Sequence, residues 1–378
     1  MPSTTYPEFG HDTEALEVAK AFADVVRDKT IIVTGGNRSG IAFSTAEALV
    51  SITMSSPCPT QLIIIQVAQA PARLIVASRS LDKIQEFTNA LKKDYPNVDY
   101  RHLQVDLSSQ DSVRAAAANL MSWADVPAVD ILINTAGVMG IQERTLTKEG
   151  IEMHLATNHL GHWLFTCLIA PKLIKAAESN PKGATRIVNV SSRSPTISAM
   201  RWSDMTFEVK NKDLPETEQP NYQYMDAWGY TDAKNRAYVP VDGYHRSKVA
   251  NILFGIGANR RLFEKHGILS VGLHPGVIAT ELARNFPEET LKQINVMAQR
   301  GFMSYKTLGA GASTSLVAAL DPKLAEGVGE SKDGRENWGA YMEDCQPSGK
   351  ANPLAVSSSE AERLWDFSEK SVGQSFSW

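Results

Sequence analysis

Short apolar runs alternate with helical patterns along most of this chain, and this alternation restricts the fold more than any other feature. The runs at residues 30–34, 73–79, 100–107, 130–137, 186–192 and 268–276 have the length and composition of buried strands. Helical patterns occupy residues 81–91, 112–123, 151–177 and 244–265. We therefore predict an α/β fold, a doubly wound parallel sheet with helices on both faces that binds ligands at the carboxyl ends of its strands.

A glycine turn joins the first strand to the first helix and reads Gly35-Gly36-Asn37-Arg38-Ser39-Gly40-Ile41. Glycines permit a tight turn, and they let backbone N–H groups and the helix N-terminus approach a pyrophosphate. Such a turn alone is a weak signal, because an ordinary strand-to-helix loop is the alternative.

A second signal is Tyr244-His245-Arg246-Ser247-Lys248, at the start of a helical stretch. Residues i and i+4 share one face of a helix, so the Tyr244 phenol and the Lys248 ammonium should lie one turn apart. A fixed cation favours the phenolate and would make Tyr244 a usable proton donor and acceptor. The same spacing recurs at Tyr230 and Lys234, but Pro240 and Gly243 follow closely, so we interpret this copy as loop.

Taken in order, the motifs resemble the short-chain dehydrogenase/reductase family, in particular its retinol dehydrogenase-like branch and fungal, secondary-metabolism-type relatives. The resemblance covers nearly everything from Thr30 onward. It is carried by residues 34–41, 106–107, 134–137, 157–162, 190–192, 244–248, 274–280 and 359–365.

The resemblance implies a role for each catalytic residue. Tyr244 would be the general acid/base, and Ser192 would hold the substrate oxygen. Lys248 would bind the nicotinamide ribose and hold down the pKa of Tyr244, while Asn158 would position a water that relays protons to Lys248. Ser191 points to the opposite face from Ser192 by strand alternation, and the family pattern favours Ser192.

The cofactor implied is NADP(H), with NAD(H) less favoured. Arg79 ends the second strand, where an acidic residue would bind the ribose 2′-hydroxyl of NAD and an arginine accommodates the 2′-phosphate of NADP. Arg38 adds a second cation, although either arginine alone could be ordinary surface charge. The remaining cofactor contacts implied are Gly35, Ser39, Gly40 and Ile41 in the turn, Asp106 and Leu107 at the adenine, Asn134, Ala136 and Gly137 at the adenosine ribose, and Pro275, Gly276, Val277 and Thr280 with Tyr244 and Lys248 at the nicotinamide end.

Three departures from the family pattern stand out. The glycine turn is one residue longer than the commonest form and ends in Ala42, and Thr135 stands where Asn is usual, which leaves a hydroxyl in place of an amide. Residues 50–66 exceed the usual helix-to-strand connection of about 2–6 residues. We expect this segment to be translated intron or a gene-model error, with a real surface insertion as the alternative.

We expect one domain at residues 30–378 after an N-terminal extension and helix at 1–29. Within it, residues 193–243 should form a substrate-side lobe, and residues 281–378 the substrate-proximal and C-terminal helices. The lobe is rich in aromatic residues and suits a small hydrophobic or aromatic, polyketide-like carbonyl. A formal net charge of −4 gives no footprint for nucleic acid.

The three cysteines lack metal spacing, and no secretory signal or integral membrane segment is evident, so the cytosol is the expected compartment. His154, His159 and His162 cluster on one helix without a Cys or carboxylate partner at ligand spacing, and we expect no metal. A homodimer is left open. The alternative functions are a non-catalytic NADP-binding regulatory protein and a Rossmann-like methyltransferase, which would need an acidic residue in place of Arg79.

Overall fold

The apolar runs form the strands of one eight-stranded sheet with the order β10-β9-β6-β5-β4-β1-β2-β3. The structure, a computed structural model, describes residues 3–51, 71–301 and 303–378. The strands are β1 (Thr30–Thr34), β2 (Arg73–Ser78), β3 (Asp99–Gln104), β4 (Ile131–Asn134), β5 (Thr185–Val190), β6 (Ile268–His274), β7 (Val277–Ile278), β8 (Tyr305–Lys306), β9 (Tyr341–Glu343) and β10 (Gln346–Pro347). All pairings in this sheet are parallel except β9 with β10. The predicted doubly wound fold is confirmed, and its order reverses between β1 and β4, where such folds bind ligands.

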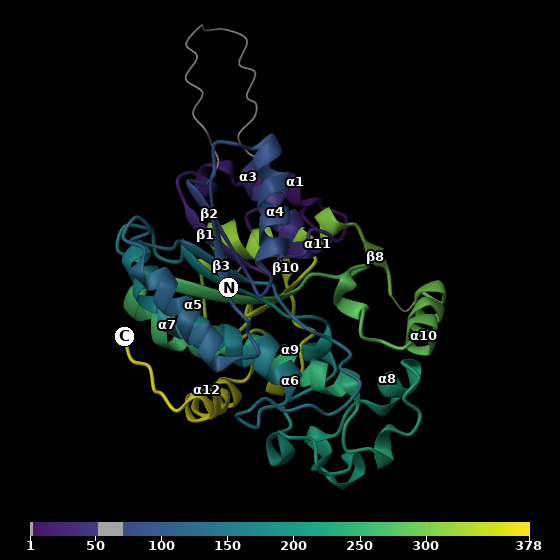
Figure 1. The fold of residues 1–378 in the computed structure, drawn as a ribbon. Coiled ribbons are helices and arrows are strands. Elements are labelled where there is room, and N and C mark those ends of the chain that lie inside the picture. Colours follow the sequence, from purple (N-terminus) through teal and green to yellow (C-terminus); the bar gives the residue numbers. More distant parts are fainter. Residues whose placement is uncertain (1–2, 52–70, 302) are drawn as a thin grey trace, which may run out of the picture.

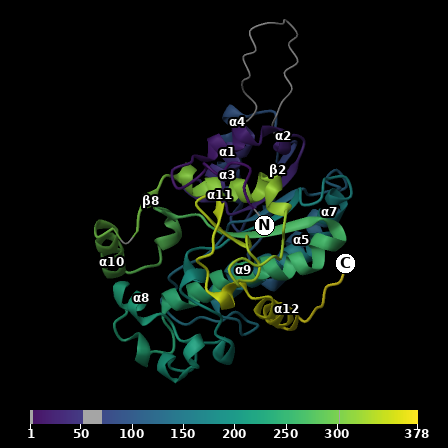
Figure 2. The ribbon, with the colours of Figure 1, turned by 180° about the vertical axis from the view of Figure 1, so that it is seen from behind.

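Helices cover both faces of the sheet (Figures 1 and 2). Their bounds are α1 (Ala15–Ala21), α2 (Ala23–Val26), α3 (Ile41–Val50), α4 (Leu81–Asp94), α5 (Gln110–Ser122), α6 (Met153–Leu155), α7 (Gly161–Ala177), α8 (Tyr222–Ala227), α9 (Pro240–His266), α10 (Glu288–Gln299), α11 (Leu308–Leu320) and α12 (Ser358–Val372). Helices α1, α3, α4 and α11 lie on one face, and α5, α7, α9 and α12 lie on the other. Within the described residues, no helix combines the length and the apolar character needed to cross a bilayer.

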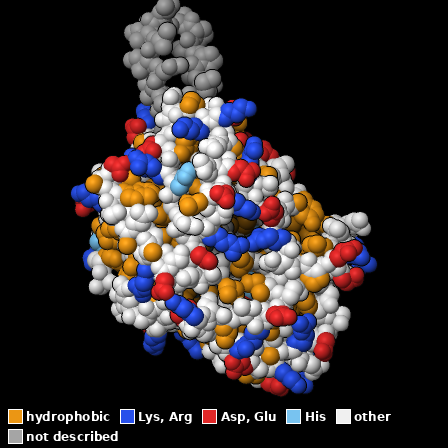
Figure 3. All heavy atoms as spheres, viewed as in Figure 1, with side chains coloured by type: hydrophobic (Ala, Val, Ile, Leu, Met, Phe, Trp, Pro, Cys, Tyr) orange, Lys and Arg blue, Asp and Glu red, His pale blue; other side chains and the backbone are white. Residues whose placement is uncertain are grey.

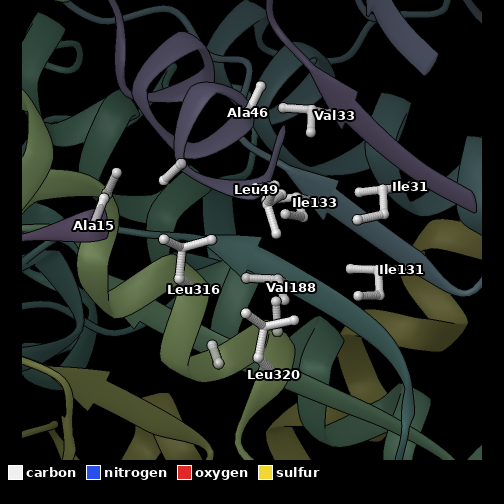
Figure 4. Packing of buried hydrophobic residues seen from close by; sticks show 14 of the residues in the cluster. Ala15, Ile31, Val33, Ala46, Leu49, Ile131, Ile133, Val188, Leu316 and Leu320 are labelled. Carbon is white, nitrogen blue, oxygen red and sulfur yellow. The ribbon is translucent and has the colours of Figure 1, made fainter. Parts of the chain in front are cut away.

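The central strands are apolar on both faces because each face is covered by helices. On the α3 and α11 side, Ile31, Val33 and Val188 pack against Leu49 and Leu316 (Figure 4). Neighbouring strand residues such as Ile32 and Ile75 point to the other face and join a second core with α5 and α7. This two-sided burial explains why the runs lack the alternation of a half-exposed strand.

Several predicted boundaries differ from the structure, and two of them bear on the site. Helix α9 begins at Pro240, one turn before Tyr244, because proline is well tolerated at the first helical position. Strand β4 ends at Asn134, and the backbone then leaves the sheet because the Thr34 hydroxyl accepts the N–H groups of Thr135 (2.9 Å) and Ala136 (3.0 Å). Helix α3 continues through the buried Val50, whereas residues 52–66 of the suspected surplus segment lie outside the described residues.

The predicted lobe at residues 193–243 is anchored to α9 by buried ion pairs. Arg201 donates to Asp204 at 2.7 Å, and Arg246 donates to Asp242 at 2.9 Å. Arg201 also lies 3.7 Å from Asp242 and thereby joins the two pairs. All four side chains are at most 5% exposed, so the lobe and the start of α9 share one desolvated network.

Candidate active site

A cavity of about 890 Å³ opens at the carboxyl ends of β4, β5 and β6. Its wall begins at the glycine turn with Ser39 and Ile41 and continues past Gly137 to Ser192 and Tyr244. The far wall is formed by α8 and α10, which lie side by side at one side of the molecule (Figures 1 and 2). This volume lies within the range of small-molecule sites, about 300–1,000 Å³.

Tyr244 and Lys248 meet on this wall as their helical spacing predicts. The Lys248 ammonium lies 5.7 Å from the centre of the Tyr244 ring, and both side chains are buried. Lys248 Nζ donates to the backbone carbonyl of Val190 at 2.9 Å, which ties α9 to the end of β5. Ser192 follows β5 directly and lines the same cavity, so the structure brings the three residues together.

Burial favours the neutral forms of both Tyr244 and Lys248, which the sequence did not indicate. Desolvation raises the pKa of Tyr244 above its ordinary value, with a smaller opposing effect from a hydrogen bond to Ser192. Desolvation also lowers the pKa of Lys248 to about 7. Burial disfavours the charged form of both groups, and the expected effect of Lys248 on the Tyr244 pKa stays a prediction.

Ser191 and Ser192 have separate surroundings. Ser191 Oγ donates to the Lys248 carbonyl at 2.6 Å and therefore supports the backbone of α9. Ser192 Oγ accepts from Ser194 N at 3.0 Å and donates to Ser194 Oγ at 2.7 Å. Both serines line the cavity, and the choice of Ser192 as the residue that faces a substrate stays a prediction.

Asn158 lies on a π-helical turn, Ala156–Leu160, that interrupts the predicted continuous helix 151–177. Its side-chain oxygen accepts from Val138 N at 2.8 Å, and its nitrogen donates to Val138 O and Ser247 Oγ, both at 2.9 Å. The side chain thus joins the loop after β4 to α9, and these contacts engage both ends of the amide. The expected role in holding a water stays a prediction.

His162 links Asn158 to strand β1 through hydrogen bonds. Because Thr34 Oγ1 accepts two backbone N–H groups, its own hydrogen must point to His162 Nε2, 2.9 Å away. His162 Nδ1 then carries the proton and donates to the Asn158 carbonyl at 3.1 Å. Burial lowers the pKa of His162 to about 4, which agrees with a neutral ring. The chain from β1 to Asn158 was not apparent in the sequence because its members lie far apart along the chain.

The glycine turn has the shape that a close ligand approach requires. Gly35 adopts φ +108°, which favours glycine, and a Cβ on Gly36 would lie 2.9 Å from the Ser78 side chain. Helix α3 begins at Ile41 with Gly40 as its N-cap, without a side-chain cap and without an acidic residue in its first turn. Its N-terminal N–H groups are therefore suited to an anion.

Arg38, within this turn, and Arg79, directly after β2, are both exposed. Gly36 touches Ser78, the neighbour of Arg79, so the two arginines flank the same backbone. Arg38 lies over the Phe43 ring at 5.9 Å, and within the described part of the chain neither guanidinium has a carboxylate within ion-pair distance.

Other expected cofactor residues fall into two groups. Gly137, Pro275, Gly276, Val277 and Thr280 line the cavity with Ser39 and Ile41, whereas Gly35, Arg38, Gly40, Arg79, Asp106, Leu107, Asn134 and Ala136 lie outside its wall. The Asp106 carboxylate accepts from Ser108 N and Oγ, at 3.0 and 2.7 Å. The buried Asn134 amide donates to Asn189 on β5 at 2.9 Å, so its side chain serves the sheet rather than the cavity.

The Thr135 hydroxyl does not form the hydrogen bond that the usual Asn amide would form. This buried hydroxyl has no hydrogen-bond partner among the residues that the structure describes. The Thr34 hydroxyl instead satisfies the backbone at this point.

The loop after β6 is supported by a buried cation. Gly276 has φ +93°, and a Cβ there would lie 2.6 Å from the Lys306 side chain. Lys306 Nζ pairs with Asp344 at 2.6 Å, and β8, which contains Lys306, pairs with β7. This small sheet attaches the segment that carries α10 to the cavity floor.

Tyr224 and Trp228 of the predicted aromatic lobe line the cavity. Three further cavity residues, Arg193, His245 and Met303, were not recognised in the sequence. The signal that could have found His245 and Arg193 is their place directly after Tyr244 and Ser192.

The second Tyr–Lys pair lies outside any long helix, as predicted. Tyr230 is in a turn after α8, and Lys234 Nζ lies over the Tyr222 ring at 5.1 Å instead. The three clustered histidines have separate partners: Glu152 for His154, Ser368 for His159 and Thr34 for His162. Among the described residues no group of His, Cys, Asp or Glu is arranged to hold a metal ion.

Basic and acidic side chains are interspersed over the face seen in Figure 3.

Comparisons with known proteins place these features in context. The family model described as short chain dehydrogenase matches residues 61–203. Oxidoreductase fscI of Fusarium equiseti is 33% identical over 268 residues, which cover 71% of this chain and 94% of the relative. Short-chain dehydrogenase TIC 32 A, chloroplastic, of Brassica napus is 31% identical over 91% of this chain and 88% of its own, and human Retinol dehydrogenase 12 is 30% identical over 91% and 86%.

Solved structures agree on the fold. A putative uncharacterized protein from Mycobacterium paratuberculosis has a TM-score of 0.58 at 22% identity and covers 95% of this chain and 98% of its own. The 3-oxoacyl-[acyl-carrier protein] reductase from Brucella melitensis, solved in complex with NAD, has a TM-score of 0.54 at 17% identity, with 88% and 98% covered.

Proposed function

Because the chain belongs to the short-chain dehydrogenase family, we propose that Tyr244, Ser192, Lys248 and Asn158 form its catalytic site and that NADP(H) is its cofactor. Membership makes the protein an oxidoreductase that acts on CH–OH or C=O groups of small molecules with a nicotinamide cofactor. The substrate that we propose is a small hydrophobic or aromatic carbonyl compound, or the corresponding alcohol.

One observation carries the assignment of the site. Ser192, Tyr244 and Lys248 come from two elements far apart in the chain, yet they share one cavity wall that begins at the glycine turn. Such a wall can hold a cofactor along one end and a substrate oxygen between Ser192 and Tyr244.

The residues of the chain fit the chemistry of the reaction. When bound, the cofactor supplies or accepts a hydride. Reduction builds negative charge on the substrate oxygen, and the Ser192 hydroxyl would donate a hydrogen bond to that oxygen while Tyr244 gives it a proton. In oxidation Tyr244 takes the proton back. Lys248 and Asn158 keep α9, the end of β5 and the loop after β4 in a fixed relation through their bonds to Val190, Val138 and Ser247.

The preference for NADP over NAD rests on charge. Arg38 and Arg79 flank the glycine turn without a carboxylate partner in the described ranges, and a 2′-phosphate would supply the missing anion. The residues present therefore fit a phosphorylated dinucleotide: glycine backbone and a helix N-terminus for the pyrophosphate, and two guanidinium groups for the phosphate.

A spectrophotometric screen tests this proposal. Purified protein is mixed with a panel of aromatic and alicyclic aldehydes and ketones, and the absorbance of NADPH or NADH is followed in parallel. We expect turnover with kcat/KM at least about tenfold higher for NADPH, equivalent to about 1.4 kcal/mol. Equal use of both cofactors would contradict the role of the arginines, and tight NADPH binding without turnover across the panel would favour a regulatory protein.

The assembly and the compartment stay predictions. Size-exclusion chromatography with light scattering would decide whether a homodimer forms, and microscopy of the tagged protein would test the cytosolic location.

A further inference from the structure

The substrate side of the cavity carries a guanidinium that has no partner among the residues that the structure describes. Arg193 follows Ser192 directly, is exposed, and lines the cavity. Its backbone carbonyl accepts from Thr196, but within the described ranges its side chain has no hydrogen bond and no ion pair. Among the described residues, Glu281 is the one carboxylate on the cavity wall, and it pairs with Lys83 at 3.7 Å.

A buried histidine lines the same cavity as this arginine. His245 is 3% exposed and packs between the rings of Tyr224 and Tyr244, with centroids 5.3 and 6.3 Å away. No described residue hydrogen-bonds to its ring nitrogens, although the side chain lines the cavity. Burial lowers the pKa of His245 to about 4, so the neutral ring offers one N–H donor. A polar side chain this buried normally has a partner, and here the cavity is where a partner can lie.

Tyr224 lies between Arg193 and His245 in its interactions, because it packs on His245 and is affected by the charge of Arg193. It lies on α8 at the cavity wall, beside His245, and the charge of Arg193 opposes part of the rise that burial causes in the Tyr224 pKa. The guanidinium is therefore within electrostatic reach of the Tyr224 hydroxyl. Guanidinium, phenol and imidazole together offer donors and a positive charge to one region of an otherwise largely apolar wall.

This region is separate from the proposed phosphate site. Arg193 acts electrostatically on Tyr224, His274 and Tyr341, which belong to α8, β6 and β9. Arg38 and Arg79 lie near β1 and β2, on the other side of the switch point of the sheet. A cofactor phosphate and an anion at Arg193 would thus occupy different ends of the site.

We propose that Arg193, Tyr224 and His245 form a subsite that binds a carboxylate of the substrate, so that the enzyme favours hydrophobic carbonyl compounds that carry a carboxylate group. The subsite borders Ser192 and Tyr244 because two of its members are their chain neighbours. An arginine suits a carboxylate because its donors match the two oxygens in a bidentate fork. The inference rests on the proposed function, which it makes more specific.

A free acid and its methyl ester, which lacks the negative charge, test this subsite. With NADPH, we expect kcat/KM for 4-formylbenzoate to exceed that for methyl 4-formylbenzoate by at least about tenfold. In Arg193→Gln this preference should fall to about twofold or less through a higher KM for the acid. Tyr224→Phe should weaken the preference in part.

Arg300→Gln is the matched control, because Arg300 is an exposed arginine at the end of α10 that does not line the cavity. A binding measurement separates this inference from the proposed function. Calorimetric titration of the protein with NADP⁺ present should show naphthalene-2-carboxylate binding more tightly than 2-naphthamide, and Arg193→Gln should remove the difference.

The outcomes are distinct. Equal use of acid and ester by the wild type, or equal effects of Arg193→Gln and Arg300→Gln, would overturn the subsite while turnover itself upholds the proposed function. Carboxylate binding that depends on Arg193 in a protein that turns over neither aldehyde would uphold the subsite and overturn the proposed reaction.

Discussion

Tyr244 is the residue on which the proposed chemistry depends most directly. Tyr244→Phe keeps the ring and its packing against His154 and His245 but removes the proton. We expect kcat/KM to fall by at least about a hundredfold with NADPH binding retained. Steady-state kinetics and a fluorescence titration of NADPH would measure both. Tyr230→Phe is the control and should stay near wild type; similar losses in the two variants would show that Tyr244 has no special role.

Arg79 is the residue that should decide between the cofactors. Arg79→Asp replaces the proposed phosphate partner with a carboxylate that can accept from a ribose 2′-hydroxyl. We expect the ratio of NADPH to NADH affinity to fall by at least about tenfold. Direct binding titrations with both cofactors check this, and an equal change for the two would argue against a phosphate site at Arg79.

Lys248 should make the stability of the cofactor-free protein depend on pH. Its pKa is about 7 in the folded protein and about 10.4 when exposed, so between these values the unfolded chain binds a proton that the folded chain lacks. The free energy of unfolding should therefore rise with pH from about 7 to about 10 in the wild type, relative to Lys248→Met.

Denaturant unfolding of both proteins across this pH range would measure the difference. Lys265→Met, at an exposed position near the other end of α9, controls for the loss of a charge. A constant difference between wild type and Lys248→Met would mean that Lys248 stays protonated when buried.

The sequence indicates the proposed catalytic residues better than the cavity around them. Tyr244 and Lys248 are linked by helical spacing, and Ser192 by its place at a strand end, so each follows from local pattern. Arg193 and His245 have no such pattern, because the partners that they lack can be recognised only when the surrounding elements are packed. The ionisation of Lys248 likewise depends on burial, which a motif does not encode.

At the scale of elements, the start of α9 depends on a glycine. A Cβ on Gly243 would lie 2.9 Å from His154 Nδ1 and 3.2 Å from Glu152 Oε1. His154 is held on both sides, since Nδ1 bonds to Glu152 at 2.7 Å and Nε2 accepts from Ile141 N at 3.3 Å. We expect Gly243→Ala to lower the free energy of unfolding by about 1–3 kcal/mol and to reduce kcat, because the helix must shift beside Tyr244.

Gly255 in the same helix is the matched position. A Cβ there would meet Ser270 Oγ at an ordinary 3.5 Å, so Gly255→Ala should be neutral or stabilising by up to about 1 kcal/mol through helix propensity. Urea unfolding and kcat of the two variants give the comparison. Equal effects would mean that the His154–Glu152 pair can move aside for a Cβ at position 243 at little cost in stability.

Long apolar elements were predictable, and short or irregular ones were not. Strands β1, β2, β4, β5 and β6 follow from composition, because burial on both faces demands it, whereas β3 lies at the edge of the sheet and is mostly half-buried or exposed. The two- or three-residue strands β7 to β10 carry no pattern of their own and form because their partners are in place. The π-helical turn at Asn158 has helical composition, so only its tertiary contacts distinguish it.

At the scale of the whole molecule, the main question is whether residues 50–66 belong to the native protein. Val50 is fully buried at the end of α3. Deletion of residues 50–66 would place Val67 directly after Leu49, so a valine would again follow Leu49 in the sequence. We expect the shortened protein to bind NADPH and to be at least as stable, with loop closure alone contributing about 1 kcal/mol or less. Thermal unfolding and cofactor titration measure this.

Transcript sequencing tests the origin of the segment directly. Mature messages that all retain it, together with a shortened protein that fails to fold or to bind NADPH, would show that it belongs to the protein. Removal of residues 193–209 of the lobe is an informative contrast, because it would expose the buried charges of Asp242 and Arg246 and should abolish folding.

The far wall of the cavity has two parts, the lobe that contains α8 and the helix α10, and these should differ in how well they tolerate substitutions. The lobe shares the buried network of Arg201, Asp204, Asp242 and Arg246 with α9, so a new side chain there risks leaving a charge without its partner. The α10 wall is attached through β7–β8 and the Lys306–Asp344 pair, and it faces the cavity with apolar side chains such as Leu291 and Ile294. A mutant library aimed at new substrates should therefore yield active variants more often from α10 than from the lobe, and divergence among descendants of this protein should accumulate on the same side.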